Sequence, residues 1–517
     1  YLTPGVYVEE FEIGAKPIEG VSTSTAGFLG KTERGPTSPQ LVTNWLQFQK
    51  IYGSYTNDSY LAYAVDGFFT NGGQRCFIGR VAANDASTAS IKLTAAGTDA
   101  LTVEAIGEGE WGKRIVVKVG VGTENTTAKP LFKLSVFYWN DPLPSTLFDP
   151  ESNKKSKPQP ALVELYDNLS LDPKSPDYFD LKINGISSLI TISLETGYSG
   201  TIPNAPNTVT PLEGTDLDGT AIALDDYLRN SAADDIPGKR KGLTAFREID
   251  EISIICSPDA LNVNAPALAQ ALINHCEDLK DRFAIIDADD GSSNVSNIKP
   301  RDSVSDTKYA AFYYPWIKII DPLTGKEKLI PPSGHIAGIY ARSDVERGVH
   351  KAPANEVVRG AMDLEFQITK GEQGILNPRG VNVIRTFPGR GIRVWGARTL
   401  SSDALWKYIN VRRLFIFVEE SIEEGTQWVV FEPNDEKLWA RVRATITQFL
   451  TRVWKDGALM GTKAEEAFFV KCDRTTMTQD DIDNGRLICI IGIAPVKPAE
   501  FVIFRIAQWA GGSSATE

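Results

Sequence analysis

The chain has 517 residues, of which 42% are hydrophobic and 23% are charged, and its formal net charge is -12. This composition is ordinary for a globular protein of about three or four domains. The negative charge argues against attraction of the whole chain to nucleic acid or to an anionic membrane, and no apolar run reaches the ~18–20 residues of a membrane-spanning helix.

The first twenty residues predict an extended arm. The run VYVEEFEI is typical of a strand, yet neither a turn nor a second strand follows it. Apolar side chains occupy both faces of this strand, so a single partner sheet with a solvated back fits it poorly. We therefore expect the strand to pair with another subunit. The side chains assigned to this contact are Val6, Tyr7, Val8, Phe11 and Ile13.

Two separated regions, residues 21–90 and 206–345, predict one middle α/β domain. The first contains a strand, STAGFLG, and an apolar helix, LAYAVDGFFT, which ends at an Asn-Gly-Gly turn. The second contains a buried strand, EISIIC, then an amphipathic helix and a second strand, RFAIID. A strand, a helix and a strand in that order predict a crossover unit on a covered sheet.

Residues 91–205, which separate these regions, predict a β-rich insertion. The runs RIVVKVG, LFKLSVFYW and FDLKING are typical of strands, and polar stretches rich in Pro, Ser and Lys lie between them. The polar loops favour a surface-exposed insertion domain.

Two segments raise the alternative of a nucleotide-driven enzyme. Gly107, Gly112 and Lys113 match the spacing of a phosphate-binding P-loop, but Arg114 stands where that loop needs Ser or Thr, and a strand follows where a helix is required. The acidic run Asp287–Asp290 follows a predicted strand and is suited to a divalent cation, although a solvated loop is commoner. We expect no catalytic residue and no enzyme activity.

The cysteine and histidine patterns predict neither a metal site nor a cofactor. The three histidines form no HxxxH or HxH pair, and the cysteines show no CxxC spacing. Five reduced core thiols are therefore expected, as in a protein made in the cytosol: Cys76, Cys256, Cys276, Cys472 and Cys489.

The last block, residues 346–517, contains a predicted amphipathic helix at 434–456. Pro433 and Asn434 suit a helix start, and Gly457 suits a stop. Seven apolar side chains fall on one side of this helix and predict its core face: Leu438, Trp439, Val442, Ile446, Phe449, Leu450 and Val453.

Another side of the same helix carries a row of positively charged side chains. They lie within about 60° of arc, and no acidic residue interrupts them. Such a row is a solvated face, a set of cations paired with carboxylates elsewhere in the fold, or a docking surface for an acidic partner. We refer to these four residues as the basic stripe: Lys437, Arg441, Arg452 and Lys455.

The end of the chain predicts a second arm. Residues 500–509 form a β-prone run after Pro498 and precede a Gly/Ser tail. Two arms without local hairpin partners indicate strand addition between subunits, and head-to-tail contacts of this kind close into rings or continue as helices. The side chains assigned to the second arm are Phe501, Val502, Ile503, Phe504 and Ile506.

Several motifs resemble those of the contractile tail sheath family, which includes the sheaths of phage tails and of phage-like contractile injection systems. The resemblance is dense over about 1–35 and 300–510 and weak over most of 85–205. The motifs are TPGVYVEE, YAAFYYPWI, PPSGHIAGIYAR, RGVHKAPANE, LNPRGVNVIR, GRGIRVWGARTL, WKYINVRRLF, WVVFEPND and APVKPAEFVIF.

The resemblance implies a structural subunit that forms hexameric discs stacked helically around an inner tube. Such a sheath assembles in an extended, high-energy state and contracts to drive the tube through a target envelope. Implied partners are further copies of the chain, a tube protein with an acidic outer surface, a baseplate and tail terminator or cap proteins, with neither nucleic acid nor direct membrane insertion. Phage tail, bacteriocin and injection system remain open.

The resemblance also implies a multidomain, mixed α/β (α+β) fold. A discontinuous inner domain would combine the arm 1–20 with 346–517, and the helix 434–456 would face the tube. The middle domain would combine 21–90 with 206–345, and the insertion 91–205 would lie outside. We expect synthesis in the bacterial cytoplasm and incorporation into a phage tail or tail-like particle.

Overall fold

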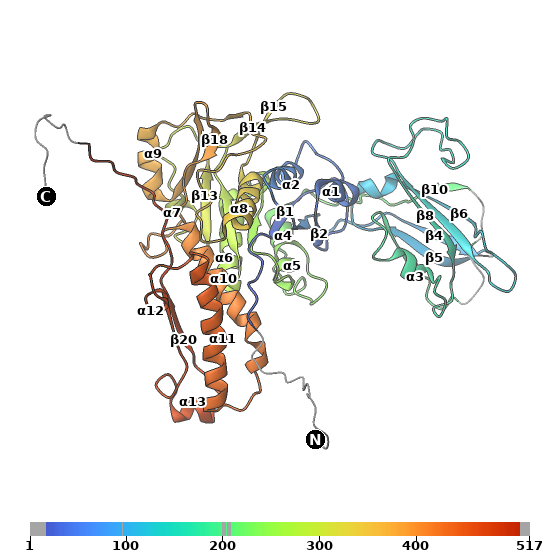
Figure 1. The fold of residues 1–517 in the computed structure, drawn as a ribbon. Coiled ribbons are helices and arrows are strands. Elements are labelled where there is room, and N and C mark those ends of the chain that lie inside the picture. The colour runs from blue at the N-terminus through green and yellow to red at the C-terminus, as the bar shows by residue number, and fades with distance from the viewer. Residues whose placement is uncertain (1–16, 96, 199–202, 204–207, 507–517) are drawn as a thin grey trace, which may run out of the picture.

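The computed structural model describes residues 17–506, apart from residue 96 and residues 199–202 and 204–207. Its centre is an eight-stranded sheet with the order β18-β17-β13-β12-β11-β1-β3-β2, in which β17, β13, β12, β11, β1 and β3 run parallel (Figure 1). The strands are β1 Ala26–Gly30, β2 Gln40–Val42, β3 Cys76–Arg80, β11 Ile254–Cys256, β12 Phe283–Asp287, β13 Ala310–Tyr314, β17 Val381–Phe387 and β18 Gly391–Val394.

Helices cover both faces of this sheet, which explains why its central strands are apolar throughout. Helices α2 (Leu61–Thr70) and α8 (Ser333–Arg347) pack on one face, while α5 (Gly242–Ala245) and α6 (Ala265–Leu279) pack on the other. A Cβ atom on Gly334 would lie 2.3 Å from the carbonyl oxygen of Ala64, so glycine permits the close approach of α8 to α2. The remaining helices around the sheet are α1 Trp45–Tyr52, α4 Leu224–Leu228, α7 Pro300–Ser303 and α9 Lys370–Leu376.

The predicted crossover unit is confirmed. Strand β11 pairs in parallel with β12, and α6 connects them. The predicted strand at 24–30 and the predicted helix at 61–70 are present as β1 and α2. A small antiparallel sheet lies beside the central one, with β14 (Ile317–Ile320) between β15 (Glu327–Ile330) and β16 (Asp363–Leu364).

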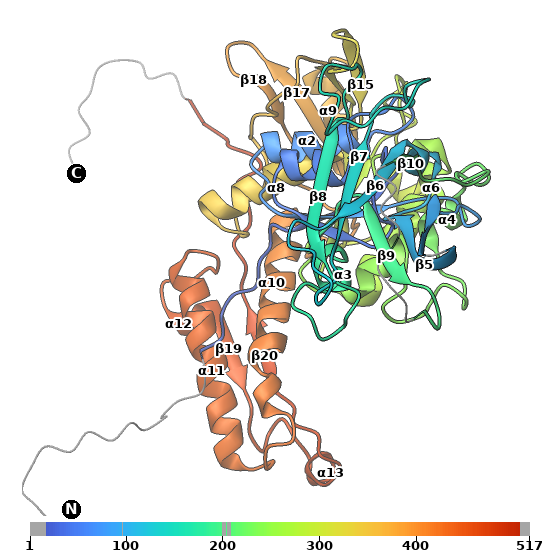
Figure 2. The same cartoon turned by 90° about the vertical axis from the view of Figure 1, so that its right-hand side faces the viewer.

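The region predicted to be β-rich, together with residues 209–211 beyond its predicted end, forms two sheets at one side of the molecule (Figure 1), the side that faces the viewer in Figure 2. One of the predictions made there is wrong: Phe179–Ile183 in FDLKING is a short helix, α3, whose Phe179 and Ile183 are one helical turn apart and both buried. The two sheets consist of β4 Ser90–Ala95, β5 Thr98–Ala105 and β9 Ile190–Leu194, and of β6 Ile115–Val121, β7 Phe132–Tyr138, β8 Leu162–Leu169 and β10 Val209–Pro211.

The last block of the chain contributes to two parts of the molecule. Residues 381–394, which the sequence-based division assigns to the C-terminal domain, form β17 and β18 of the central sheet. The chain then enters a long helical part that projects away from the sheet (Figure 1). This part consists of α10 Ile409–Gly425, α11 Glu436–Lys455, α12 Ala464–Ala467, α13 Gln479–Asp483, β19 Phe468–Lys471 and β20 Ile490–Ile493.

The N-terminal segment ties these two parts together. Ile18 is 1% exposed in the core of the helical part, and a Cβ on Gly425 of α10 would lie 2.6 Å from it. Thr23 donates from its hydroxyl to Asp344 of α8 at 2.7 Å, and Arg413 of α10 donates to Asp344 at 2.6 and 2.9 Å. One carboxylate therefore joins the N-terminal segment, α8 and α10.

Candidate functional site

Helix α11 is the predicted amphipathic helix, and its two faces lie as predicted from the sequence. Asp435 caps its start by accepting from the backbone N–H of Leu438. All seven residues predicted for the core face are buried. They pack against α10, where the rings of Phe417 and Phe449 lie 5.9 Å apart, and against β19.

The basic stripe is exposed along α11. Among the residues that the structure describes, none of its four cations forms an ion pair with a carboxylate. The Arg441 guanidinium lies 4.5 Å from the centre of the Trp428 ring, and Arg452 donates to the carbonyl oxygen of Ile18. Neutral groups therefore position Arg441 and Arg452, and none of the four charges is neutralised by a carboxylate within the described part of the subunit.

Strands β19 and β20 form a sheet of two antiparallel strands, with no third strand in the described ranges. One face of the sheet packs on α11 and contains Phe468, while the other exposes half of Phe469 and of Ile490. A two-stranded sheet in water is marginal, and its unpaired edges can accept further strands.

The described part of the predicted C-terminal arm is exposed and has no regular secondary structure. Its five apolar side chains are 68 to 94% exposed. The segment leaves the molecule near α9, away from the subunit's own β19 and β20 (Figures 1 and 2). Contiguous exposed apolar groups of this kind commonly mark interaction sites. The residues predicted for the N-terminal arm, Val6 to Ile13, lie outside the described residues.

Glu500 fixes the point at which this segment begins, and the sequence analysis did not single it out. Its carboxylate accepts from Arg398 at 2.7 and 2.8 Å, from Asn377 at 2.8 Å and from Tyr408 at 2.9 Å. Burial raises the pKa of Glu500, but these hydrogen bonds outweigh it, and the net pKa is lowered. No local motif marks this role, because the donors come from distant segments.

The two segments considered for nucleotide chemistry are engaged within the fold. Residues 110–114 form a 3₁₀ turn that leads into β6, and the Lys113 ammonium lies 2.7 Å from the Glu110 carboxylate. Ser333 donates its backbone N–H to Asp287, whose pKa burial raises to about 7. Asp289 and Asp290 are exposed. No group of His, Cys, Asp and Glu suited to a metal ion occurs among the described residues.

The usual ligand position of a parallel α/β sheet is filled by the protein itself. That position lies where the strand order reverses, here between β1 and β11. The buried Asp259 carboxylate accepts there from Lys31 N–H at 2.9 Å, from Tyr60 N–H at 2.6 Å and from the Ser59 hydroxyl at 2.8 Å. A carboxylate of the chain thus occupies the anion position before α2.

The cysteines are free, and four of the five are buried, whereas Cys489 is half-buried. Their distribution confirms the expected core thiols for all but Cys489. No helix among the described residues is both long and apolar enough to cross a membrane.

Comparison with known protein families gives two consecutive matches that together span residues 226–508. Residues 226–400 match the model of the phage tail sheath protein central domain, and residues 401–508 match that of the phage tail sheath C-terminal domain. The chain belongs to the contractile tail sheath protein family. The boundary between the two matches separates the central sheet of this sheath protein from its helical part.

Curated relatives align with part of this sheath protein. The tail sheath protein of Salmonella phage ViI is 27% identical over 274 residues, which cover 46% of this chain and 42% of that protein. The tail sheath protein of Burkholderia phage BcepMu is 29% identical over 160 residues, covering 29% and 34%. The sheath protein thus spans less than half the length of these relatives.

Solved structures align over nearly the whole sheath protein. The anti-feeding prophage helical sheath in the contracted state is 25% identical, with a TM-score of 0.58 and coverage of 98% of this chain and 99% of that one. The sheath complex of an extracellular contractile injection system, PVC, in the contracted state is 23% identical, with a TM-score of 0.60 and coverage of 99% and 98%. The mixed α/β, multi-sheet fold is thus shared along the full chain.

Proposed function

We propose that this protein polymerises as hexameric discs, stacked helically around an inner tube, and contracts to drive that tube through a target envelope. This proposal rests on the exposed apolar segment 501–506 and on the two-stranded β19–β20 sheet, which no third strand joins among the described residues. The segment is a strand donor, and β19–β20 is the acceptor on a neighbouring copy.

The shapes of donor and acceptor support this pairing. Along the segment, Phe501 and Ile503 alternate with Val502 and Phe504, so each face of an added strand would carry apolar groups. One such face can cover the apolar core beside α11, and the other can join the exposed side of Phe469. Main-chain hydrogen bonds at a sheet edge would supply the rest of the affinity.

The basic stripe is proposed as the tube-contacting surface, with an acidic tube face as its partner. Exposed ion pairs are worth about 0–1 kcal/mol each, which suits a contact that must form on assembly and break on contraction. Repeated over many subunits, such contacts set the register of sheath on tube.

The proposed energy source is the assembled lattice. Extended and contracted sheaths are two packings of one subunit, and newly buried surface between subunits would drive the change. The arms would keep neighbouring subunits connected while their bodies move. We propose further that the protein is made in the bacterial cytoplasm and that its insertion domain lies on the outside of the sheath, with baseplate and terminator proteins at the two ends.

A truncation that ends at Glu500 tests strand donation. The shortened chain should remain a folded monomer, because residues 501–506 make no strand contact within the described subunit. It should fail to form sheaths when mixed with tube and baseplate, as seen by negative-stain electron microscopy. Contractile sheaths of normal length from the truncated chain would overturn the proposal.

A further inference from the structure

The proposed donor segment follows the proposed acceptor sheet closely in the sequence of each chain. Strand β20 ends at Ile493, and the exposed segment begins at Phe501. If the segment is a donor, as proposed above, a pull on it during contraction would reach β20 through residues 494–500. Tension applied at one end of a strand breaks its ladder bonds one after another, so this pull would peel β20 from β19.

Between β20 and the exposed segment, a set of hydrogen bonds holds the side chain of Glu500. Both carboxylate oxygens are used: Oε1 accepts from Arg398 Nε and Asn377 Nδ2, and Oε2 accepts from Arg398 Nη2 and the Tyr408 hydroxyl. The Arg398 pair is bidentate and charge-assisted, which makes it stronger than a neutral hydrogen bond. We call these contacts the Glu500 clamp.

The clamp is continuous with the central sheet. Arg398 is 9% exposed, and its backbone N–H and C=O both bond the side chain of Asn382, at 2.7 Å each. Asn382 is fully buried in β17. Asn377 follows α9, and Tyr408 precedes α10, so three separate segments of the body hold one carboxylate.

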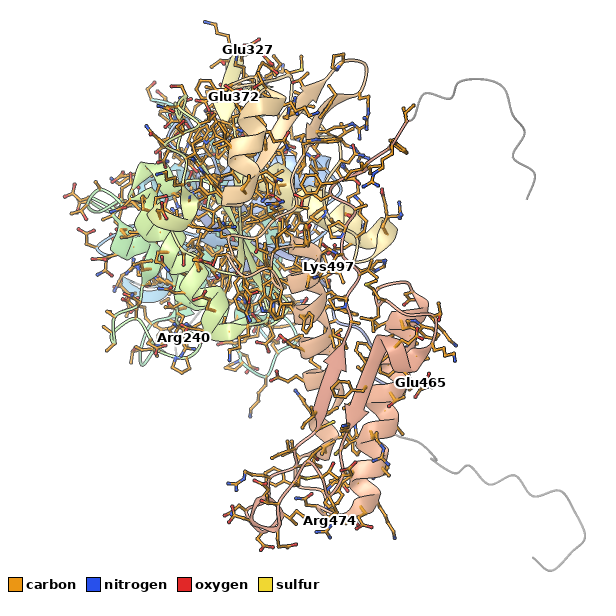
Figure 3. The ribbon with its side chains drawn as sticks, turned by 90° about the vertical axis from the view of Figure 1, so that its left-hand side faces the viewer. Arg240, Glu327, Glu372, Glu465, Arg474 and Lys497 are labelled. Atoms are coloured by element: carbon orange, nitrogen blue, oxygen red, sulfur yellow. The ribbon has the colours of Figure 1, made fainter. Side chains whose placement is uncertain are left out.

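The other hydrogen bonds that hold residues 494–500 to the subunit are weaker than the Glu500 clamp. Asn410 donates to the carbonyl oxygen of Val496 at 3.1 Å, and Val496 donates its N–H to the carbonyl oxygen of Ala458 at 3.1 Å. Ala494, next to β20, donates its N–H to the carbonyl oxygen of Ala467 and accepts from the N–H of Met460, each at 2.8 Å. All of these are single bonds between neutral groups. Lys497 is exposed, and its side chain forms no hydrogen bond or ion pair with the other described residues (Figure 3).

We propose that the Glu500 clamp anchors the root of the C-terminal arm to the central sheet, so that a pull on the arm bypasses β20. The load passes from Glu500 through Arg398 into β17. The subunit can then be pulled by its own arm and still hold a neighbour's arm on β19–β20.

Single-molecule pulling on the full-length monomer tests this anchor without any assembly. One handle is attached at the C-terminus and the other at Leu46→Cys, since Leu46 of α1 is 75% exposed beside the central sheet. Cys489→Ser is included in every variant to prevent labelling near β20. In the wild-type chain, the residues after Glu500 should extend first, and the force should then rise as the clamp resists. Strand β20 should be released only after the clamp breaks.

Glu500→Ala should abolish that resistance, so that residues 494–500 and β20 are released in an earlier step at lower force. Tyr408→Phe, which removes one donor and keeps the ring, should shift the step in the same direction by less. Lys497→Ala is the matched control in the same segment and should behave as wild type. Equal traces for Glu500→Ala and wild type, or an equal loss in Lys497→Ala, would overturn the proposal.

Amide hydrogen exchange, measured without applied force, distinguishes a mechanical role of the clamp from a role in folding β19 and β20. Amides of β19 and β20 should be equally protected in wild type and Glu500→Ala, because the clamp does not touch these strands. Loss of that protection in the unloaded variant would contradict the anchor. The pulling result would stand even if the chain truncated at Glu500 assembled normally, so the two proposals fail separately.

Discussion

At the scale of single residues, the Asp344–Arg413 pair joins the two main parts of the subunit. Both side chains are below 5% exposed, and the pair is bidentate. Removing one partner of a buried pair leaves an uncompensated charge, which costs about 3–5 kcal/mol. We predict that Asp344→Ala lowers the free energy of unfolding by about this amount, measured by urea denaturation of the monomer.

Asp363→Ala is the matched control for this measurement. Its ion pair with Lys318, at 3.7 Å, involves side chains that are 49% and 29% exposed. Loss of such a pair should cost about 0–1 kcal/mol. Equal effects of the two substitutions would show that the buried pair does not hold the helical part to the sheet.

The basic stripe gives a second prediction at this scale. Arg441→Glu combined with Arg452→Glu should leave the monomer folded, because both side chains are exposed, and should give bare tubes or tube-free polysheath. Electron microscopy of the mixed proteins at low salt measures this outcome. Lys326→Glu with Lys154→Glu makes the same change of net charge at exposed positions outside the helical part and should assemble normally. Normal assembly of the Arg441/Arg452 variant would exclude the stripe as the tube contact.

At the scale of elements, α10 meets the central sheet through a group of carboxylates. Glu420 of α10 is partly buried near the loops that contain Asp250 and Asp281. Burial, and then the charges of Asp281, Glu423, Glu424 and Asp250, raise the pKa of Glu420 to about 7. Folding is therefore coupled to proton uptake at this contact.

The sign of the resulting pH dependence follows from the raised pKa. The contribution of a protonated Glu420 is complete below its unfolded pKa of about 4.3 and is lost as the pH rises through 7. We predict that the stability of the monomer falls between pH 5 and pH 8, and that Glu420→Gln flattens this decrease, as thermal unfolding at several pH values would show. Glu465→Gln on α12 (Figure 3) should leave the slope unchanged. A wild-type slope in Glu420→Gln would contradict the assignment.

Elements with strong local patterns were predictable from the sequence. The seven-residue apolar face of α11 is all buried, and the β11–α6–β12 crossover follows from periodicity alone. The helix within FDLKING was not predictable, because its five residues, Phe179–Ile183, fit a strand and a helical turn equally well. The packing of Phe179 and Ile183 in the folded protein decides between the two.

At the scale of the whole molecule, long-range pairings set the limit of prediction. Residues 381–394 join the central sheet because β17 pairs with β13, and no local pattern encodes a partner that distant in the chain. The Glu500 clamp is similar, since Asn377, Arg398 and Tyr408 converge only in the folded subunit. The C-terminal arm and the basic stripe could be predicted from the sequence, because a run of apolar residues and a row of positive charges are local patterns.

The whole subunit combines a sheet-and-helix body with an exposed apolar segment that departs from it. We propose that this segment completes the β19–β20 sheet of a neighbouring copy. A cryo-electron microscopy reconstruction of sheath assembled from the purified chain tests this claim most directly. We predict residues 501–506 as a strand, hydrogen-bonded along an edge of β19–β20 in an adjacent subunit. A reconstruction in which those edges stay unpaired, or in which the segment folds back on its own subunit, would contradict it.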